Sequence, residues 1–475
     1  MTEQGEGVTQ AGGSSGPGTR TSSSSSSDQV LQIGFFFDGT LNNLYNAGGS
    51  GEGSYANDQS NVARLYRLYA NDPTREGSTR VVRRGVYIEG IGTRRGQGDD
   101  MVDAALGIGN TGVSARVYEA CRRLERETRH EQYREVIVDA FGFSRGAAAA
   151  RYFVNCLSRR SFEPVDTGLA VMSDEPTHLS RVRLPSVTMR FLGVFDTVAA
   201  IGSPEDGGDV SDARNADVNV HLDDSSAQVI VHLTASNEYR RNFALNSIRT
   251  RSGAVPAGGT EIALPGAHSD VGGGYRGQGE TVQPVQPAAI YTAHRSEAEA
   301  ERNALNQRYS EFTEWAQREH FAGTTPPEFH RGYDDLRDAG PDELPGIRHS
   351  YFGNVVWVRS TIRAGLDRIA LRLMHDHACN NHVPLSALPS DSQYAIPRGI
   401  QYIYDILHRG GTLSQADLAL LGMNYIHWSA HYGAVSGASR SAFRSPPRVS
   451  VDIYPHAPAP NFRRIVHANV PSRAF

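Results

Sequence analysis

The chain has 475 residues, of which 39% are hydrophobic and 21% are charged, a composition typical of a globular protein with a large core. Its 47 basic and 52 acidic residues leave a formal net charge of −5, which argues against the broad basic surface of a nucleic-acid-binding protein. The 3 cysteines lie far apart without a Cys-x-x-Cys pair, which argues against a disulfide framework or a structural zinc site.

The chain begins with a low-complexity segment rich in Gly and Ser. Such a segment cannot bury enough apolar surface to offset its ordering entropy, so residues 1–28 are expected to be a disordered tail. We find neither a run of about 18 apolar residues, which a transmembrane helix requires, nor the apolar stretch of a secretory signal peptide. We therefore expect a protein made in the cytoplasm; if it acts outside its cell, another machine must carry it.

From Gln32 onward, short apolar runs alternate with amphipathic segments. Apolar runs ended by turn residues predict buried strands, and apolar residues at helical spacing predict helices. Strands are predicted within residues 32–40, 79–93, 135–146, 187–198 and 259–275. Helices are predicted at residues 61–70, 109–129 and 147–159. This alternation predicts an α/β fold with a mostly parallel central sheet and helices on both faces.

Two stretches interrupt the alternation. Residues 202–226, rich in Gly, Asp, Asn and Ser, are expected to form a loop near the carboxyl edge of the sheet. Residues 287–338 are expected to be a helical insertion that either packs on the core or forms a lid. Its apolar side chains lie close to one helical face: Leu305, Tyr309, Phe312 and Trp315. The expected organisation is a catalytic core at 29–286, this insertion, and a region at 339–475 that completes the core or forms a cap or membrane-docking surface.

A Gly-x-Ser-x-Gly sequence at residues 142–146 carries the strongest chemical signal. It directly follows an apolar run and directly precedes a helix that starts with four alanines. A nucleophile elbow requires this strand–turn–helix setting, because the serine sits in a strained turn. Gly142 and Gly146 provide the small flanking residues that such a turn needs. We therefore predict that Ser144 is a catalytic nucleophile in a fold of the α/β-hydrolase kind, against the alternative of an ordinary glycine-rich turn.

A serine hydroxyl is a weak nucleophile without a base, and the base needs an acid that orients it. In hydrolases with this elbow the chain order is Ser, then Asp or Glu, then His. Asp196 ends the apolar run MRFLGVFD, and His268 lies in a glycine loop after the run EIAL. Both stand where loops leave the carboxyl ends of strands, the edge at which ligands bind in open α/β sheets. Asp196 and His268 are therefore the predicted acid and base.

Neighbouring residues are given supporting roles. The oxyanion hole is predicted to use the backbone N–H of Arg145 and an N–H from the loop at Gly39 and Thr40, after the first strand. Asp38 and Asp270 are expected to organise their loops or to bind a cation. No metal or other cofactor is predicted, although calcium at the Asp270 loop is left open.

Other patterns are weaker. The run FFFDGT is similar to the motif of haloacid-dehalogenase phosphatases, but Phe36 stands at the position of their nucleophile. Asp139 lies inside a strand and is a poorer candidate for the acid. His427 does not belong to a zincin motif, because Trp428 stands where a zincin would need glutamate. His427 remains a distant alternative for the base. A further cluster lacks the spacing of a common zinc site: His375, Asp376, His377, Cys379 and His382.

Four motifs occur together and in order: IGFFFDGTLNN, FGFSRGAAAAR, FLGVFDTV and LPGAHSDVGGGY. With these motifs, over about residues 32–276, the chain resembles the bacterial type VI secretion lipase effectors of family one. The resemblance implies phospholipase A-type activity on the membrane glycerophospholipids of a competing bacterium, with Ser144, Asp196 and His268 as the triad. It also implies delivery by the secretion spike, action at the periplasm or membrane of target cells, and neutralisation by a cognate immunity protein.

Two other functions stay open at this point. The chain could be a serine esterase or amidase that acts on soluble substrates, or a non-catalytic adaptor that keeps the hydrolase fold. Exposed apolar surface around the mouth of the Ser144 site would favour the lipase. An unreactive Ser144 in folded protein would favour the adaptor, but the intact order of the three predicted triad residues argues against it.

Overall fold

The structure, a computed structural model, describes residues 29–164, 179–201, 215, 218–321, 329–338, 348–359, 361–432 and 456–471. The predicted tail at 1–28 and most of the predicted loop at 202–226 lie outside these residues. In the part that is described, no helix is both long enough and apolar enough to cross a membrane.

A seven-stranded sheet forms the centre of the molecule, in the strand order β10-β8-β7-β4-β1-β3-β2. Neighbouring strands pair in parallel, except that β2 pairs antiparallel with β3. The strands of this sheet are β1 (Gln29–Phe37), β2 (Pro73–Glu76), β3 (Thr79–Ile88), β4 (Glu135–Phe143), β7 (Thr188–Phe195), β8 (Val229–Ala235) and β10 (Gly259–Leu264). The prediction of an α/β fold with a mostly parallel sheet is confirmed.

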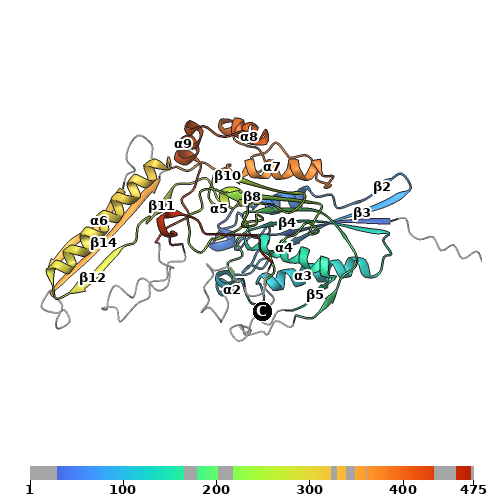
Figure 1. Ribbon diagram of the computed structural model, residues 1–475, viewed down its shortest axis with the longest axis horizontal. Helices are drawn as coiled ribbons and strands as arrows, with labels where there is room; N and C mark the ends of the chain where they lie inside the picture. Colours follow the sequence, from blue (N-terminus) through green and yellow to red (C-terminus); the bar gives the residue numbers. More distant parts are fainter. Residues whose placement is uncertain are drawn as a thin grey trace, which may run out of the picture.

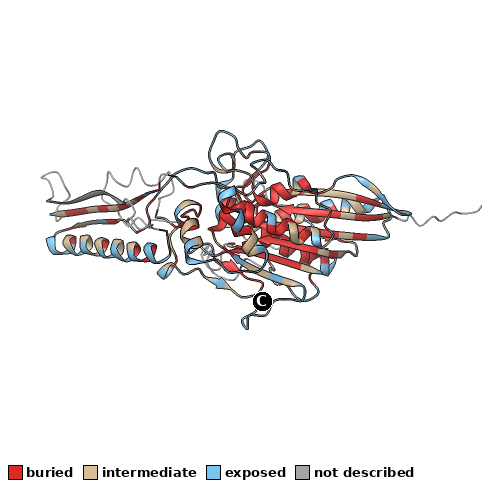
Figure 2. Ribbon diagram, turned by 90° about the horizontal axis from the view of Figure 1, so that it is seen from above, coloured by how far each residue is buried: buried red, intermediate tan, exposed pale blue. Residues whose placement is uncertain are grey.

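Four helices cover the two faces of this sheet (Figure 1): α1 (Asn61–Leu68), α3 (Val113–Arg129), α4 (Arg145–Arg159) and α7 (Asp367–Asn380). α3 and α4 pack on one face, and α1 and α7 pack on the other. Successive side chains of β1 point to opposite faces, so Phe35 and Phe37 join the core under α3 and α4 whereas Phe36 joins the other core. Because both faces are covered, the central strands are largely buried (Figure 2).

Shorter elements complete the chain. The short helices are α2 (Met101–Leu106), α5 (His268–Gly272), α8 (Gln401–His408), α9 (Gln415–Asn424) and the 3-10 helices η1 (Gly53–Tyr55), η4 (Arg398–Ile400) and η5 (Pro460–Phe462). Two small ladders join β5 (Ser161–Phe162) to β6 (Val182–Arg183) and β9 (Leu245–Asn246) to β15 (Val466–His467). The second ladder places the C-terminal segment, residues 456–471, beside the chain that follows β8.

A second sheet, which is antiparallel, projects from one end of the molecule with a long helix along it (Figure 1). Its elements are β11 (Glu280–Val282), β12 (Ala288–Thr292), α6 (Arg295–Arg318), β13 (Phe329–Asp338) and β14 (His349–Arg359). Phe312 of α6 is buried and contacts the rings of Trp357 and Trp428. The sheet crosses the boundaries predicted after residues 286 and 338, because backbone pairing joins strands from before, within and after the expected insertion. The insertion is therefore not purely helical.

Candidate active site

Ser144 stands between the end of β4 and the start of α4, in a strained turn. Its φ is +58° and its ψ is −127°, a conformation that residues other than glycine rarely adopt. The turn needs glycine on both sides because backbone atoms lie close. A Cβ atom on Gly142 would lie 2.5 Å from the Gly146 oxygen, and one on Gly146 would lie 2.3 Å from the Phe37 oxygen. The turn therefore presents Ser144 at the carboxyl edge of the sheet.

Asp196 lies beside Ser144 at the same edge. β7 pairs in parallel with β4, with Phe195 opposite Phe143, so the residues that follow these two strands are neighbours. The Ser144 amide donates a hydrogen bond of 3.1 Å to the Phe195 oxygen. A hydrogen bond of 2.5 Å joins Asp196 Oδ2 to His268 Nδ1, and both side chains are buried. The fold thus brings all three residues of the predicted triad to one edge of the sheet.

His268 is the first residue of α5, and its ring packs on Phe143, with the ring centroids 4.6 Å apart. Because Nδ1 is bound to Asp196, Nε2 is the nitrogen left for proton exchange. Nε2 is buried and, within the described part of the chain, has no hydrogen-bond partner, so Ser144 Oγ is not bonded to it in this state. Catalytic hydrogen bonds are often long without substrate and tighten when substrate binds.

Arg464, near the C-terminal end of the described chain, holds the carboxylate of Asp196. Its Nη1 and Nη2 atoms lie 2.7 and 2.8 Å from the two carboxylate oxygens, which makes a bidentate ion pair. Burial raises the pKa of Asp196, but the Arg464 charge and the hydrogen bond with His268 outweigh burial and hold that pKa well below its usual range. Asp196 is therefore ionised. The sequence analysis did not identify Arg464, because it lies 268 residues from Asp196 and belongs to no motif that indicates its ion-pair partner.

The same surroundings affect the base. Burial lowers the pKa of the His268 imidazole below its ordinary value, against the opposing effect of Asp196, and the Arg240 charge lowers it further. Glu238 balances Arg240 in an ion pair of 2.8 Å and accepts a hydrogen bond of 3.3 Å from the His268 amide. The imidazole is therefore neutral at neutral pH, which is the state that a general base needs.

The loop after β1 lies against the elbow, where the second oxyanion donor is predicted. A Cβ atom on Gly39 would lie 2.5 Å from the ring of Phe143, so glycine is required for this close approach. The Gly39 amide donates a hydrogen bond of 2.8 Å to Asp38, so this amide is engaged. The Thr40 hydroxyl oxygen is buried and, among the residues described, without a hydrogen-bond partner. The Arg145 amide stands in the first turn of α4, where backbone donors lack an intrahelical acceptor.

Asp38 and Asp270 each bind loop backbone. Besides the Gly39 amide, Asp38 accepts a hydrogen bond of 2.5 Å from the Tyr87 hydroxyl, and burial raises the pKa of Asp38. Asp270 accepts a hydrogen bond of 2.9 Å from the Ala267 amide and pairs with His427 Nδ1 at 2.7 Å. In the described segments, no group of three or more His, Cys, Asp or Glu side chains could hold a metal ion.

The other residues singled out in the sequence are engaged elsewhere. Asp139, inside β4, pairs with Arg190 at 2.6 Å and not with an imidazole. In the cluster at 375–382, His375 Nε2 lies 2.9 Å from the Ser386 oxygen, on the far side of the sheet from α4. Asp139 and the cluster at 375–382 therefore do not compete with Asp196 and His268 for a place beside Ser144.

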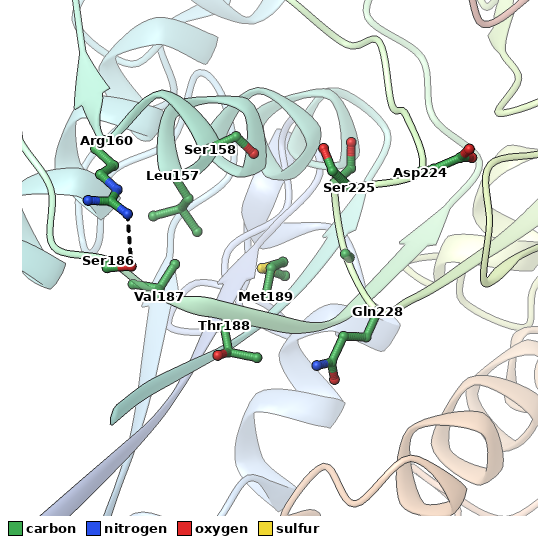
Figure 3. Close-up of a pocket in the computed structure, with 12 residues that line it drawn as sticks. Leu157, Ser158, Arg160, Ser186, Val187, Thr188, Met189, Asp224, Ser225 and Gln228 are labelled. Carbon is green, nitrogen blue, oxygen red and sulfur yellow. Dashed lines mark hydrogen bonds between the residues drawn. The ribbon is translucent and has the colours of Figure 1, made fainter. Parts of the chain in front are cut away.

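Two hollows lie away from the elbow itself. One of about 420 Å³ is lined by residues at the start of β7, among them Thr188 and Met189 (Figure 3). Asp196 follows the other end of this strand, roughly 26 Å away at the usual rise per residue, so this hollow is not the catalytic site. Another, of about 960 Å³, is lined by Asn237, Tyr239 and residues of α6 and α9. Asn237 also binds the Gly266 amide at 2.8 Å, so this second hollow borders the loop of His268.

Comparison with known proteins identifies a family and a similar solved structure. The catalytic domain of the Tle1-like phospholipase effectors of type VI secretion matches residues 32–162 and 166–293, more than half of the chain. A solved structure of the Tle1 effector bound to the VgrG spike of the type 6 secretion system is similar, with 25% identity and a TM-score of 0.64. The similarity covers 92% of this chain and 93% of that chain.

More remote similarity is found to an uncharacterized protein from Pseudomonas aeruginosa, at 19% identity and a TM-score of 0.42, over 83% of this chain and 52% of that one. No curated protein matches the chain. The family inferred from the four sequence motifs is confirmed. This chain belongs to the Tle1-like family of type VI secretion phospholipase effectors.

Proposed function

We propose that this protein is an antibacterial phospholipase of the A type, which hydrolyses acyl esters of membrane glycerophospholipids with Ser144, His268 and Asp196. The observation that carries the proposal is the buried Asp196–His268 pair, whose unbonded Nε2 lies in a ring packed on the residue before Ser144. Family membership supports the substrate class, because the matching family is one of phospholipase effectors.

In the first half of the reaction, His268 Nε2 accepts the proton of Ser144 as Oγ attacks the ester carbonyl. Asp196 holds the ring through Nδ1 and stabilises the imidazolium that forms. The amides of Arg145 and of the Gly39–Thr40 loop donate to the oxyanion; since the Gly39 amide is engaged by Asp38, Thr40 is the better donor of that loop. The lysolipid leaves with the proton from His268.

In the second half, water attacks the acyl-enzyme while His268 accepts its proton, and the fatty acid is released when Ser144 recovers that proton. The neutral state of the buried imidazole supports this role, because only a neutral ring can accept the first proton. Whether the ester cut is the first or the second of the glycerol backbone is decided by the mass of the lysolipid product from a substrate whose two acyl chains differ.

The biological setting follows from the family. The Tle1 effector of the similar solved structure is bound to a VgrG spike. We propose that this protein is likewise carried by a spike protein into target cells, where the phospholipids of the membrane are its substrate. Because a producer's own membranes contain the same lipids, a cognate immunity protein is part of the proposal.

The test compares purified wild-type protein with Ser144→Ala on vesicles of defined phosphatidylethanolamine and phosphatidylglycerol, with products identified by mass. We expect free fatty acid and lysolipid from the wild type and a loss of about a millionfold in turnover for Ser144→Ala. Ser158→Ala changes an exposed serine on the same helix and serves as the matched control.

Fatty acid release by Ser144→Ala at the wild-type rate would refute the mechanism. Labelling of Ser144 by a fluorophosphonate, together with hydrolysis of soluble esters but not of vesicles, would instead indicate an esterase of soluble substrates. A folded wild type that neither labels nor hydrolyses would indicate the adaptor.

A further inference from the structure

Several buried or largely buried arginines in the described part of this protein are paired with carboxylates or enclosed by carbonyl oxygens. The ion pairs and their shortest N–O distances are Arg64–Asp367 (2.6 Å), Arg190–Asp139 (2.6 Å), Arg240–Glu238 (2.8 Å), Arg359–Glu280 (2.5 Å) and Arg464–Asp196 (2.7 Å). Arg151 instead donates to the carbonyl oxygens of Val220 and Asn246, both at 2.6 Å. This pattern is expected, because a charge taken out of water is costly unless it is paired or hydrogen-bonded.

Arg145 departs from this pattern. Its guanidinium makes a single hydrogen bond, from Nη1 to the Ala105 oxygen, and at 3.4 Å this bond is long. No carboxylate of the described chain lies within ion-pair distance of Arg145. Burial lowers the pKa of Arg145 to about 10. Among the residues that the structure describes, Arg145 is thus a partly desolvated cation without a counter-charge.

The guanidinium of Arg145 is packed on one side and part of the residue is open to solvent. The side chain of Arg145 lies over Gly107, where an added Cβ atom would come within 3.3 Å of both Cδ and Nη1. Asp103 of α2 lies four residues before Gly107 but does not pair with Arg145. Its carboxylate instead accepts hydrogen bonds from the amide and the hydroxyl of Thr111, at 2.8 and 2.7 Å. Arg145 itself keeps part of its surface exposed, so a ligand can reach the guanidinium without unfolding the loop.

The position of Arg145 relates this cation to the proposed reaction. It directly follows Ser144, so the two Cα atoms are about 3.8 Å apart. It is also the first residue of α4, a helix of 15 residues whose amino end adds a positive field at the same place. In a glycerophospholipid the phosphodiester is separated from the scissile acyl ester by only a few bonds. A lipid held with its ester at Ser144 therefore carries its anion within the reach of an arginine side chain.

We propose that the Arg145 guanidinium binds the phosphodiester of the phospholipid and so selects phosphate-bearing lipids over neutral acylglycerols, an inference that rests on the proposed function. Two parallel N–H···O bonds to the phosphate oxygens replace the long contact with Ala105. The site reads the phosphate common to this lipid class, not the alcohol beyond it. The phosphate neutralises the Arg145 guanidinium only while substrate is bound.

The test measures kcat and KM on mixed micelles of phosphatidylglycerol and, separately, of diacylglycerol with the same acyl chains. Wild type is compared with Arg145→Gln, Arg145→Lys and, as control, Arg159→Gln, which changes an exposed arginine at the other end of α4. Hydrogen bonds to charged groups contribute about 1.5–3 kcal/mol, and 1.4 kcal/mol is about tenfold. We therefore expect Arg145→Gln to lower the phospholipid-to-diacylglycerol ratio of kcat/KM by about 10- to 100-fold, mainly through KM.

Arg145→Lys keeps the charge but loses the planar fork, so its ratio should fall between wild type and Arg145→Gln. An equal loss on both lipids for a variant whose Ser144 still reacts with a fluorophosphonate would overturn the phosphate site and leave the phospholipase intact. If Arg145→Gln fails to fold, the phospholipid-to-diacylglycerol ratio of kcat/KM is compared between wild type and Arg145→Lys instead. A lower ratio for Arg145→Lys supports the phosphate site, and an unchanged ratio overturns it. A wild type that cleaves diacylglycerol but no phospholipid would overturn both the phosphate site and the proposed function.

Discussion

Two Asp–His pairs meet at the short helix α5, and they differ in charge. His268 contributes the imidazole of one pair, with Asp196 at 2.5 Å, and Asp270 contributes the carboxylate of the other, with His427 at 2.7 Å. All four side chains are buried. The pKa of His268 is nevertheless lowered, whereas the pKa of His427 is raised.

The neighbours of each pair explain the difference. Burial lowers the pKa of both rings. Beside His268, the charge of Arg240 adds to that decrease, whereas beside His427 the Asp270 charge and then the Glu280 charge outweigh burial. The imidazole of His268 is therefore shifted toward its neutral form, and that of His427 is shifted toward its charged form. The contrast shows that an Asp–His contact does not by itself fix the direction of the imidazole pKa shift, because burial and the neighbouring charges also contribute.

The largest contrast between the pairs is expected in turnover. His268→Ala removes the proposed base and should lower kcat by roughly 10⁴- to 10⁶-fold. His427→Ala should lower kcat by less than about tenfold, because its ring does not touch the reacting atoms. The measurement is fatty acid release from phospholipid vesicles, with circular dichroism to verify folding. Equal losses in the two variants would contradict the assignment of the base.

Removing Arg464 should destabilise the acid of the first pair. Arg464→Met leaves Asp196 as a buried carboxylate without its bidentate partner, which should cost about 3–5 kcal/mol in the free energy of unfolding. Urea denaturation measures this loss. Arg464→Lys keeps a charge and should lose less. The exposed Arg463, one residue earlier, provides the control as Arg463→Met, and a similar loss there would show that the ion pair is not the cause.

Breaking the second pair should have a smaller effect on stability, and one that depends on pH. His427→Gln removes a buried hydrogen bond to Asp270 and should cost about 1–3 kcal/mol. Because the pKa of His427 is raised in the folded protein, the stability from its charged form is complete below about 6.5, the unfolded value, and is lost as the pH rises through the folded pKa. The difference in unfolding free energy between wild type and variant should therefore be larger at pH 5.5 than at pH 9. A constant difference would contradict the cationic state.

The smallest expected effect is a shift in the pH profile. Activity requires neutral His268, whose pKa is lowered, so kcat/KM should persist below the ordinary imidazole range before it falls with decreasing pH. Arg464→Lys and Arg464→Met progressively weaken the neutralisation of Asp196, so the acid limb should move upward, by about one pH unit in the methionine variant. Loss of activity in these variants without any shift would reduce Arg464 to a structural role.

Much of the candidate site could be predicted from local sequence. The elbow at 142–146 needs small residues between a buried strand and a helix. These residues are consecutive in the chain, so a local pattern is enough to predict the elbow. The alternation of apolar runs and amphipathic helices likewise predicted the parallel sheet and the edge at which Asp196 and His268 emerge. The projecting antiparallel sheet was missed, because β13 is polar in sequence and its pairing with β14 is made by backbone atoms.

What the sequence determined by itself is the strained serine and the strand ends around it, since each depends on the conformational preferences of neighbouring residues. Only the tertiary structure decided which charges stand beside each imidazole. Asp270 is two residues from His268 in sequence, yet positions two apart in a helix face different ways, so it pairs with His427 instead. Arg464 reaches Asp196 from 268 residues away because β15 pairs with β9. Charge interactions act through space, and no local pattern records such a distance.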